Sequence, residues 1–355
     1  MAYTTISKQT DFFNTVLYSG NNAASHSITG VGHQPDLVWL KNRGNTADHQ
    51  LQDSARGKSG SNYYYIQSNT NSAQTVQGDY DGVNTLGTDG FTVGYTNSTA
   101  WNKSTNNYVS WNWKAGTTSG LSGGTITPSS YSFNTTSKFG IYKYTGNGTS
   151  GATVPHGLGV VPTLILVKRL DTTGSTQVFA GGNGQSGAAN YAKLDSTDAF
   201  ASNTNRWNDT APTTSVFSLG NSAEVNASGG TYVAYVWCDV QGYFKSGTYS
   251  GNGNADGPFV YTGGRPALIL MRPNIAGKNW YLFDDKRDGY NSSLKFNYPN
   301  TSAAEGNISG YVDIYSQGFK LTTTDDSFNG LGNSYQYWCW LQTTVGSNNV
   351  PCTAR

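Results

Sequence analysis

The chain has 355 residues, of which 12% are charged, and its net charge is +1. This balance lacks the basic excess typical of nucleic-acid binders, so no nucleic-acid partner is expected. The 13% of aromatic residues supply more apolar surface than a disordered chain carries. Good helix formers are few, and β-branched, aromatic and turn-forming residues are many, which favours a nearly all-β protein.

The N-terminal stretch "MAYTTISKQTDFF" has neither a basic start nor an apolar core, so no signal peptide is expected. No apolar run is long enough to cross a bilayer, which predicts synthesis in a cytoplasm and no membrane insertion. The three cysteines, Cys238, Cys339 and Cys352, form neither an even framework nor a metal-binding pair. Cys238 and Cys339 are expected to be small buried strand residues.

The first predicted strand ends at Tyr18 in "YSGNN", where Gly and Asn favour a tight turn. A continuous apolar strand follows in "PDLVWLK", with Pro35 at its start, where no ladder donor is lost. A further strand, "GFTV", contains Phe91, and a closing strand, "YVSWNW", begins at Tyr108. The alternation of side chains along a strand places one set on a common face: Val109, Trp111 and Trp113.

The same four landmarks then recur twice: at Tyr144, Pro162, Phe217 and Tyr232, and at Tyr249, Pro266, Phe319 and Tyr335. The interval from the Pro to the Phe is 56, 55 and 53 residues, and that from the Phe to the closing Tyr is 17, 15 and 16. Four landmarks in one order at nearly constant spacing indicate a tandem triplicate. Short strands with Gly-rich turns predict that each copy is a β-sandwich of the jelly-roll type.

The landmarks place repeat 1 at 1–116, a Gly/Ser/Thr linker at 117–126, repeat 2 at 127–242 and repeat 3 at 243–355. Because only the first junction carries a spacer, repeat 1 is expected to be the most independently placed copy, and repeats 2 and 3 to pack more closely together. Limited proteolysis is then expected to begin between Ala115 and Ile126 and to release repeat 1.

The aromatic residues divide into two groups. Those of the closing strands recur in every copy and are predicted to fill the core: Trp111, Trp113, Tyr235, Trp237, Trp338 and Trp340. Others occur once, in polar, Asn-rich stretches, and are predicted to be exposed contacts for a sugar or another protein. This second group consists of Tyr63, Tyr64, Tyr65, Trp101 and Trp207.

One charged pair recurs in two copies. Asp53 with Arg56 and Asp284 with Arg287 occupy matched places, whereas repeat 2 has Asn183 at the position of the Arg. Arg56 and Arg287 are therefore candidate ligand contacts. The alternative, which we favour, is a fixed salt bridge that braces a loop.

Other short motifs carry little chemistry. "GNGTSG" (146–151) lacks the following helix that a phosphate-binding loop needs and predicts a turn. The four histidines are scattered without metal-ligand spacing. The acidic pairs Asp79/Asp81, Asp195/Asp198 and Asp325/Asp326 leave calcium open as an alternative to a protein without a cofactor. No catalytic residues are predicted.

Six segments together resemble a known family: "SITGVGHQPDLVWLKNR", "DSARG", "YVSWNWKAG", "VPHGLGVVPTLILVKR", "SVFSLGNSAEVNASGGTYVAY" and "YSGNGNADGPFVYTGGRPALILM". The chain is similar, over almost its whole length, to tandem-repeat virion structural proteins of tailed bacteriophages of marine and aquatic bacteria. The resemblance implies tail-fibre-like proteins built of lectin-like, concanavalin-like sandwiches, and it implies no catalytic residues. The stretches "HQLQDSARG" and "NNVPCTAR" depart from the pattern.

The leading hypothesis is a non-enzymatic bacteriophage virion protein, surface-exposed and tail-associated, which takes part in host attachment. It would be made in the host bacterial cytoplasm. Its expected partners are other virion proteins, further copies of itself and a host cell-surface glycan. An alternative is a capsid decoration or head-fibre protein. A third is a polysaccharide depolymerase with two catalytic carboxylates.

Overall fold

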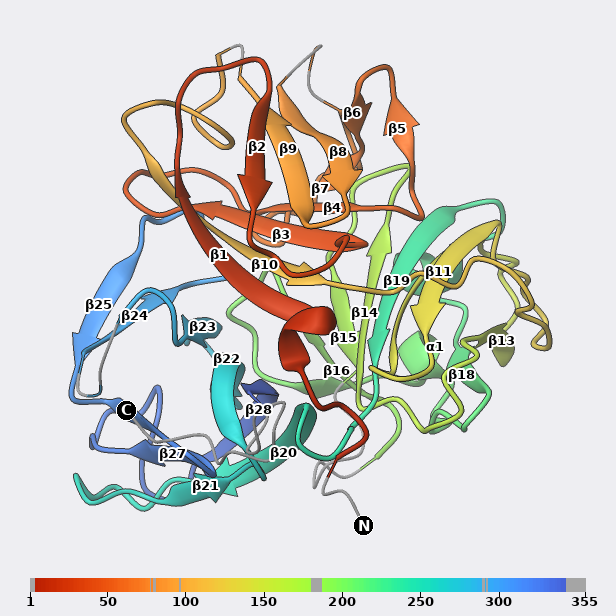
Figure 1. The fold of residues 1–355 in the computed structure, drawn as a ribbon. Helices are drawn as coiled ribbons and strands as arrows, with labels where there is room; N and C mark the ends of the chain where they lie inside the picture. Colours follow the sequence, from red (N-terminus) through yellow and green to blue (C-terminus); the bar gives the residue numbers. More distant parts are fainter. Residues whose placement is uncertain are drawn as a thin grey trace.

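The computed structural model describes residues 4–76, 78, 81–95, 97–179, 187–288, 291 and 293–342. The described chain is nearly all β, as predicted, and every strand pairing is antiparallel. Three groups of sheets, one from each repeat, surround a common centre (Figure 1).

Repeat 1 begins with a 3-10 turn, η1 (Gln9–Asp11), and forms a large and a small sheet. The large sheet has the order β1 (Phe13–Ser19), β10 (Asn107–Trp113), β3 (Leu37–Asn42), β4 (Gln50–Asp53) and β7 (Tyr65–Ile66). The small sheet has the order β2 (His26–Thr29), β9 (Gly90–Gly94) and β8 (Gly82–Gly87). A short hairpin is added by β5 (Lys58–Ser59) and β6 (Asn62–Tyr63).

Repeat 2 has the longest large sheet and two four-residue helices, α1 (Thr204–Trp207) and α2 (Ala223–Asn226). Its large-sheet order is β11 (Ser130–Asn134), β12 (Phe139–Thr145), β19 (Thr231–Trp237), β14 (Leu164–Arg169), β15 (Gln177–Phe179), β16 (Asn190–Lys193) and β17 (Ala201–Ser202). The small sheet pairs β13 (Ala152–Pro155) with β18 (Val216–Leu219).

Repeat 3 follows directly, without a spacer. Its large-sheet order is β20 (Phe244–Ser250), β28 (Ser334–Gln342), β22 (Arg265–Pro273), β23 (Tyr281–Asp284), β24 (Ser293–Asn297) and β25 (Gly306–Ser309). Its small sheet has the order β21 (Phe259–Tyr261), β27 (Gly318–Leu321) and β26 (Val312–Tyr315).

The closing strand of each repeat is buried on both faces, and its alternation divides its side chains between two cores. One face meets the small sheet of the same repeat, and there lie Tyr108, Tyr232 and Tyr335. The other face enters a core that all three repeats share. The predicted core aromatics are confirmed: Trp111, Trp113, Tyr235, Trp237, Trp338 and Trp340 are all at most 2% exposed and all lie in this shared core.

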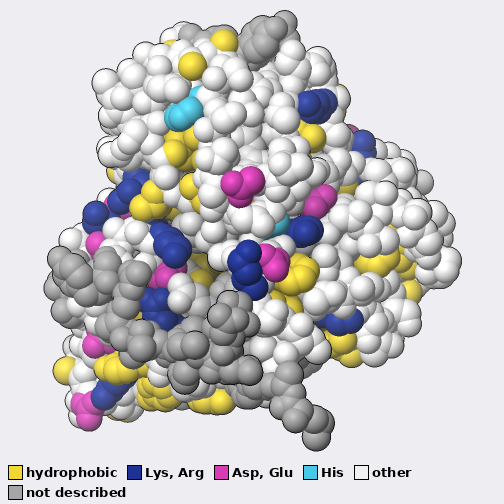
Figure 2. Space-filling view, viewed as in Figure 1, with side chains coloured by type: hydrophobic (Ala, Val, Ile, Leu, Met, Phe, Trp, Pro, Cys, Tyr) yellow, Lys and Arg dark blue, Asp and Glu magenta, His cyan; other side chains and the backbone are white. Residues whose placement is uncertain are grey.

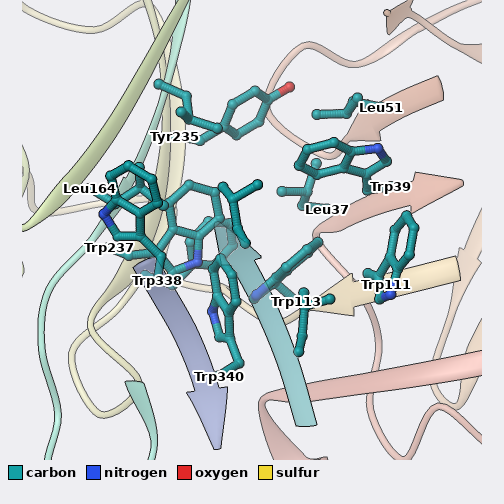
Figure 3. Close-up of a cluster of buried hydrophobic side chains, with 14 of the residues drawn as sticks. Leu37, Trp39, Leu51, Trp111, Trp113, Leu164, Tyr235, Trp237, Trp338 and Trp340 are labelled. Atoms are coloured by element: carbon teal, nitrogen blue, oxygen red, sulfur yellow. The ribbon is translucent and has the colours of Figure 1, made fainter. Parts of the chain in front are cut away.

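The shared core has a three-fold arrangement at its centre (Figure 3). The rings of Trp113, Trp237 and Trp340, one from each repeat, meet edge to face, with centroids 5.3–5.9 Å apart. Each of these rings also packs against a phenylalanine on the neighbouring strand of its own sheet, at 4.8–5.1 Å: Phe13, Phe139 and Phe244. Equivalent residues of the three copies therefore make equivalent contacts.

A buried cation joins each repeat to the next around this centre. Lys41 Nζ donates to Ala47 O of its own repeat and to Ser302 O of repeat 3. Lys168 Nζ donates to Gly174 O and to Thr70 O of repeat 1. Arg272, at the same position of repeat 3, donates to its own Lys278 and to Asp198 of repeat 2. Burial lowers the pKa of both lysines to about 8.

The expectation that repeat 1 stands apart from the others is wrong. Repeat 1 contributes to the shared core as fully as repeats 2 and 3 do, because its sheet buries an equivalent aromatic face. At the first junction, Asp36 accepts hydrogen bonds from Ser132 Oγ (3.0 Å) and from Ala115 N (2.8 Å). Both ends of the predicted linker are also fixed, since Thr117 pairs with Phe133 and Ile126 is buried.

Candidate functional site

The two recurring ion pairs are buried, which confirms the salt-bridge interpretation. Arg56 Nε donates to Asp53 Oδ2 at 2.5 Å, and Arg287 Nε donates to Asp284 Oδ2 at 2.6 Å. Both ends of each pair have fully buried side chains. Burial is the largest single influence on the pKa of Arg56 and would lower it, but the Asp53 carboxylate and the Tyr235 hydroxyl together outweigh burial and raise it.

Each buried carboxylate also accepts a hydrogen bond from a neighbouring repeat. Tyr235 Oη of repeat 2 donates to Asp53 Oδ2 at 2.7 Å. Trp111 Nε1 of repeat 1 donates to Asp284 Oδ2 at 3.1 Å. The pairs therefore connect a loop to the shared core, and neither Arg56 nor Arg287 is available as an exposed ligand contact. Asn183 of repeat 2 lies outside the described residues.

Three aromatics predicted to be exposed are buried, so the prediction is wrong for Trp101, Trp207 and Tyr65. Trp101 is 0% exposed and packs against Tyr65, itself 7% exposed, with ring centroids 5.4 Å apart. Trp207 is 1% exposed and packs against Phe179 at 5.7 Å. Trp101 lies in a turn and Trp207 ends the short helix α1, and each ring is buried in the core of its own repeat.

The remaining members of the tyrosine cluster, Tyr63 and Tyr64, are half-buried. Lys58 Nζ lies 4.8 Å from the centre of the Tyr63 ring, as in a cation–π contact. Burial raises the pKa of the Tyr63 hydroxyl. The Tyr63 ring thus has a partner within repeat 1, and both rings offer only part of their surface to a ligand.

The outer faces of the small sheets differ among the repeats. The central strands align through Phe91, Phe217 and Phe319, which face Ile28, Val154 and Val260 of the neighbouring strand. The residues on either side of that partner point outward. They are Ser27 and Thr29 in repeat 1, Thr153 and Pro155 in repeat 2, and Phe259 and Tyr261 in repeat 3; of these, Pro155 is nevertheless buried.

Repeat 3 therefore carries an exposed aromatic strip, formed by Phe259, Tyr261 and Tyr315. These side chains are 48%, 61% and 38% exposed, and the rings of Phe259 and Tyr315 meet edge to face at 5.9 Å. Figure 2 shows hydrophobic surface along the lower edge of the molecule, over β21 and β27. Beside the strip, an ion pair with Asp256 raises the pKa of Lys320 and lowers that of Asp256.

A pocket of about 300 Å³ with a mixed polar and apolar lining adjoins one end of the aromatic strip. Tyr261 and Lys245 line it, together with Asp239, Gln241 and Thr262. Asp239 is held in place by Ser246 Oγ (2.5 Å), Thr163 Oγ1 (2.8 Å) and Lys245 Nζ (3.1 Å). A second pocket of about 410 Å³ shares Asp239 and adds hydroxyl groups from three threonines of repeats 1 and 2: Thr5, Thr135 and Thr136. An exposed ring beside hydroxyl, amide and carboxylate groups suits a hydroxyl-rich ligand.

The sequence contained a signal for this strip that the repeat pattern obscured. In "PFVY", apolar side chains occupy both faces of the strand, whereas its counterparts "SIT" in repeat 1 and "TVP" in repeat 2 have small polar residues or proline on either side of the central apolar residue. The exposed aromatic residues are those at positions where repeat 3 differs from repeats 1 and 2. In contrast, Trp101 and Trp207, which also occur once, are buried.

The described residues offer little for metal or redox chemistry. Cys238 and Cys339 are free and buried, as predicted; Cys339 lies in β28, whereas Cys238 directly follows the end of β19, and Cys352 lies outside the described part of the chain. Burial raises the pKa of both thiols. Among the residues described, no three His, Cys, Asp or Glu side chains gather as metal ligands. Asp79 of the proposed calcium pairs is not among them. "GNGTSG" forms a turn, as predicted.

Comparison with known families gives one match. Residues 8–343 match the family described as Domain of unknown function (DUF7483). The chain belongs to this family. No curated protein and no solved structure matches it. The described helices of this DUF7483 protein are all too short to span a bilayer.

Proposed function

We propose that this DUF7483 protein is a non-enzymatic structural protein of a tailed bacteriophage particle, exposed at the surface, tail-associated and engaged with a host-surface glycan through repeat 3. The proposal combines two kinds of support. The resemblance to tandem-repeat virion proteins suggests the particle, and the surface of repeat 3 suggests the binding role. Other virion proteins would anchor the chain.

The observation that carries the binding role is the aromatic strip on repeat 3. The three repeats share one core, to which each contributes equivalent residues. Residues that occur on the outer face of one repeat alone are therefore not required by that core. Phe259 and Tyr261 replace small polar or proline residues there and leave large apolar rings in water. Flat rings of this kind stack on the apolar faces of sugars, and the adjoining pocket supplies hydrogen-bonding groups.

A binding assay on host cells tests this role. Fluorescently labelled protein is titrated onto intact host bacteria and onto their purified surface polysaccharide. Tyr261→Ala is expected to weaken binding roughly five- to tenfold, the scale of one lost aromatic contact. Thr29→Ala, the equivalent position of repeat 1, is the matched control and is expected to bind as the wild type does. Equal binding by both variants would contradict the assignment to repeat 3.

Immunogold labelling of intact particles tests the location. Label on the tail at a dozen or two copies per particle is the expected result. Label on the head at hundreds of copies would replace the tail assignment with capsid decoration, and no label would contradict the virion proposal. Release of reducing sugar from host polysaccharide by the purified protein would contradict the non-enzymatic part.

A further inference from the structure

The three junctions between repeats differ in how they are joined. Repeats 1 and 2, and repeats 2 and 3, follow each other along the chain, whereas repeats 1 and 3 meet only through non-covalent contacts. At each junction a backbone amide donates across to the neighbouring repeat: Ala47 N to Ser302 O, Gly174 N to Asn71 O, and Gly277 N to Thr197 O. The junction between repeats 1 and 3, here called the seam, is the one that no linking segment restrains.

A buried histidine lies at the seam. His49 is 0% exposed, and its two nitrogens have different partners. Trp39 Nε1 lies 2.9 Å from His49 Nδ1, and His49 Nε2 lies 3.1 Å from Tyr298 O of repeat 3. An indole nitrogen can only donate and a carbonyl oxygen can only accept. His49 is therefore neutral, accepts at Nδ1, and donates from Nε2 across the seam.

The surroundings of His49 oppose a second proton. Burial lowers the pKa of His49 well below its usual value, and two positive charges add to this effect: Lys41 on β3 and Arg287 in the loop after β23. A second proton would turn Nδ1 from an acceptor into a donor, so the hydrogen bond from Trp39 would be lost. It would also place a third positive charge beside the other two.

The carboxylates at the seam are bound to other groups. Asp284 pairs with Arg287, and Glu305 bridges basic side chains of repeats 1 and 3. Asp48, the residue before His49, accepts hydrogen bonds from two side-chain amides of repeat 1. A doubly protonated His49 would therefore have no anionic partner among the described residues.

The other two junctions have no titratable group at the position of His49. Fourteen residues after Pro35, Pro162 and Pro266 stand His49, Thr176 and Trp280. Trp280 Nε1 donates to Lys193 O of repeat 2 at 3.0 Å, and its indole stacks on Trp338 as the imidazole of His49 stacks on Trp111. Trp280 thus makes the equivalent contact with a group that does not titrate. The other three histidines, all in the described part of the chain, bond within their own repeats.

We propose that the seam is an acid-sensitive latch: in mild acid, protonation of His49 opens the contact between repeats 1 and 3 while the other two junctions stay closed. In the open state His49 meets water, where an imidazole takes up its second proton at about pH 6.5. Because the open state binds this proton more readily than the closed state, the closed state loses stability as the pH falls below that value. Carboxylates in general respond only at about pH 4, so the histidine acts before them. This inference does not depend on the proposed function.

Residue-resolved hydrogen exchange of the full chain tests the proposal, because the three bridging amides report on one junction each. Protection is measured relative to an unstructured peptide at pH 7 and at pH 5, both below the pKa of about 8 of Lys41, so that this lysine stays charged. The protection of Ala47 is expected to fall roughly tenfold, within the limit of about twenty-five-fold that a free imidazole sets over this range. The protection of Gly174 and Gly277 is expected to remain unchanged, and this comparison requires no variant.

Two variants assign the effect to one histidine. His49→Gln removes the titration but keeps a side chain that can both accept and donate, so the protection of Ala47 should no longer depend on pH. His156→Gln is the matched control, because His156 is also buried but bonds within repeat 2, and Ala47 should respond there as in the wild type. Unchanged protection of Ala47 in the wild type at pH 5, an equal loss at all three junctions, or a wild-type response in His49→Gln would each overturn the proposal.

Discussion

The inward and outward faces of this molecule follow different rules. Facing inward, the three repeats keep equivalent residues in equivalent contacts: Trp113, Trp237 and Trp340 meet at the centre. Facing outward, the same repeats differ, and Tyr261 takes the place of Thr29 and Pro155. Residues that face inward thus stabilise the fold, whereas residues that face outward are free to bind a ligand. The predictions below test that separation.

The largest effect is expected at the centre. Trp237→Ala removes a large ring that is 2% exposed and contacts both other repeats, so it should lower the free energy of unfolding by about 3–5 kcal/mol. Tyr261→Ala on the outer face serves as its counterpart and should change stability by no more than about 0.5 kcal/mol. Chemical denaturation measures both. An unchanged unfolding midpoint for the Trp237 variant would contradict the core assignment, and the closing strand would again be a candidate ligand surface.

A slightly smaller loss is expected at the buried ion pair of repeat 1. Asp53→Asn keeps the shape of the side chain but leaves the Arg56 guanidinium without a negative partner at a fully buried site. The cost should be about 3 kcal/mol, because an unpaired buried charge is more harmful than the absence of the pair. Asp256→Asn, which breaks an exposed ion pair, is the control for charge alone and should be nearly silent. Equal losses in the two variants would argue against a structural role specific to the buried pair.

The buried lysines predict a stability that depends on pH. Folded Lys41 loses its proton near pH 8, whereas an unfolded lysine does so near 10.5. Between these values the unfolded chain binds more protons, so raising the pH stabilises the folded state, by on the order of 1–2 kcal/mol for each lysine. Buried tyrosines such as Tyr235 have raised pKa values and act in the opposite direction only above pH 10.

The measurement is a series of denaturant titrations from pH 7.5 to 10. Lys41→Arg places the residue type of repeat 3 in repeat 1. Burial lowers the pKa of Arg272 at the equivalent position only to about 10, so arginine keeps its charge over most of this range. The stability of the Lys41→Arg variant should therefore rise less with pH than that of the wild type. The control variant Lys58→Arg changes a lysine on an exposed strand, and its stability should rise with pH as that of the wild type does. A wild-type stability that falls steadily from pH 8 would contradict the assignment.

The smallest effect concerns the predicted linker. Residues 118–120 and 122–124 are exposed, so a protease should cut there, but the two fragments should remain associated through the shared core. Size-exclusion chromatography of the cut protein should give the elution volume of the intact chain, and only denaturant should separate the fragments. Spontaneous release of repeat 1 would restore the expectation of an independent first domain.

Much of the fold could be predicted because its signals are local and repeated. Alternation along "YVAYVW" assigned Tyr235 and Trp237 to one buried face, and spacing revealed the triplicate. The shared core could not be predicted, because an apolar face looks the same in sequence whether it meets its own small sheet or another repeat. The sequence likewise does not reveal that the amine of Lys41, at the end of an apolar strand, donates to backbone carbonyls of two repeats.

The candidate site was predicted less well than the fold. Trp101 and Trp207 stood out because no tryptophan recurs at their positions. The position of Trp101 is nevertheless a core position in every repeat, since Val225 and Phe328 at the same distance from the closing tyrosine are also buried. Only the register of the small sheets shows that Phe259 and Tyr261 occupy outward positions. That register depends on long-range pairing between β21 and β27, which spacing alone does not specify.

The direction of the contacts between repeats limits how many repeats such a protein can contain. Repeat 1 reaches repeat 3, repeat 3 reaches repeat 2, and repeat 2 reaches repeat 1, through Lys41, Arg272 and Lys168 in turn. Head-to-tail contacts that return to their starting point form a closed ring, unlike the open stack of a solenoid, to which units can be added at either end. A fourth copy would find no vacant place around the tryptophan centre. A longer chain of this design must therefore enlarge its loops or build a second ring.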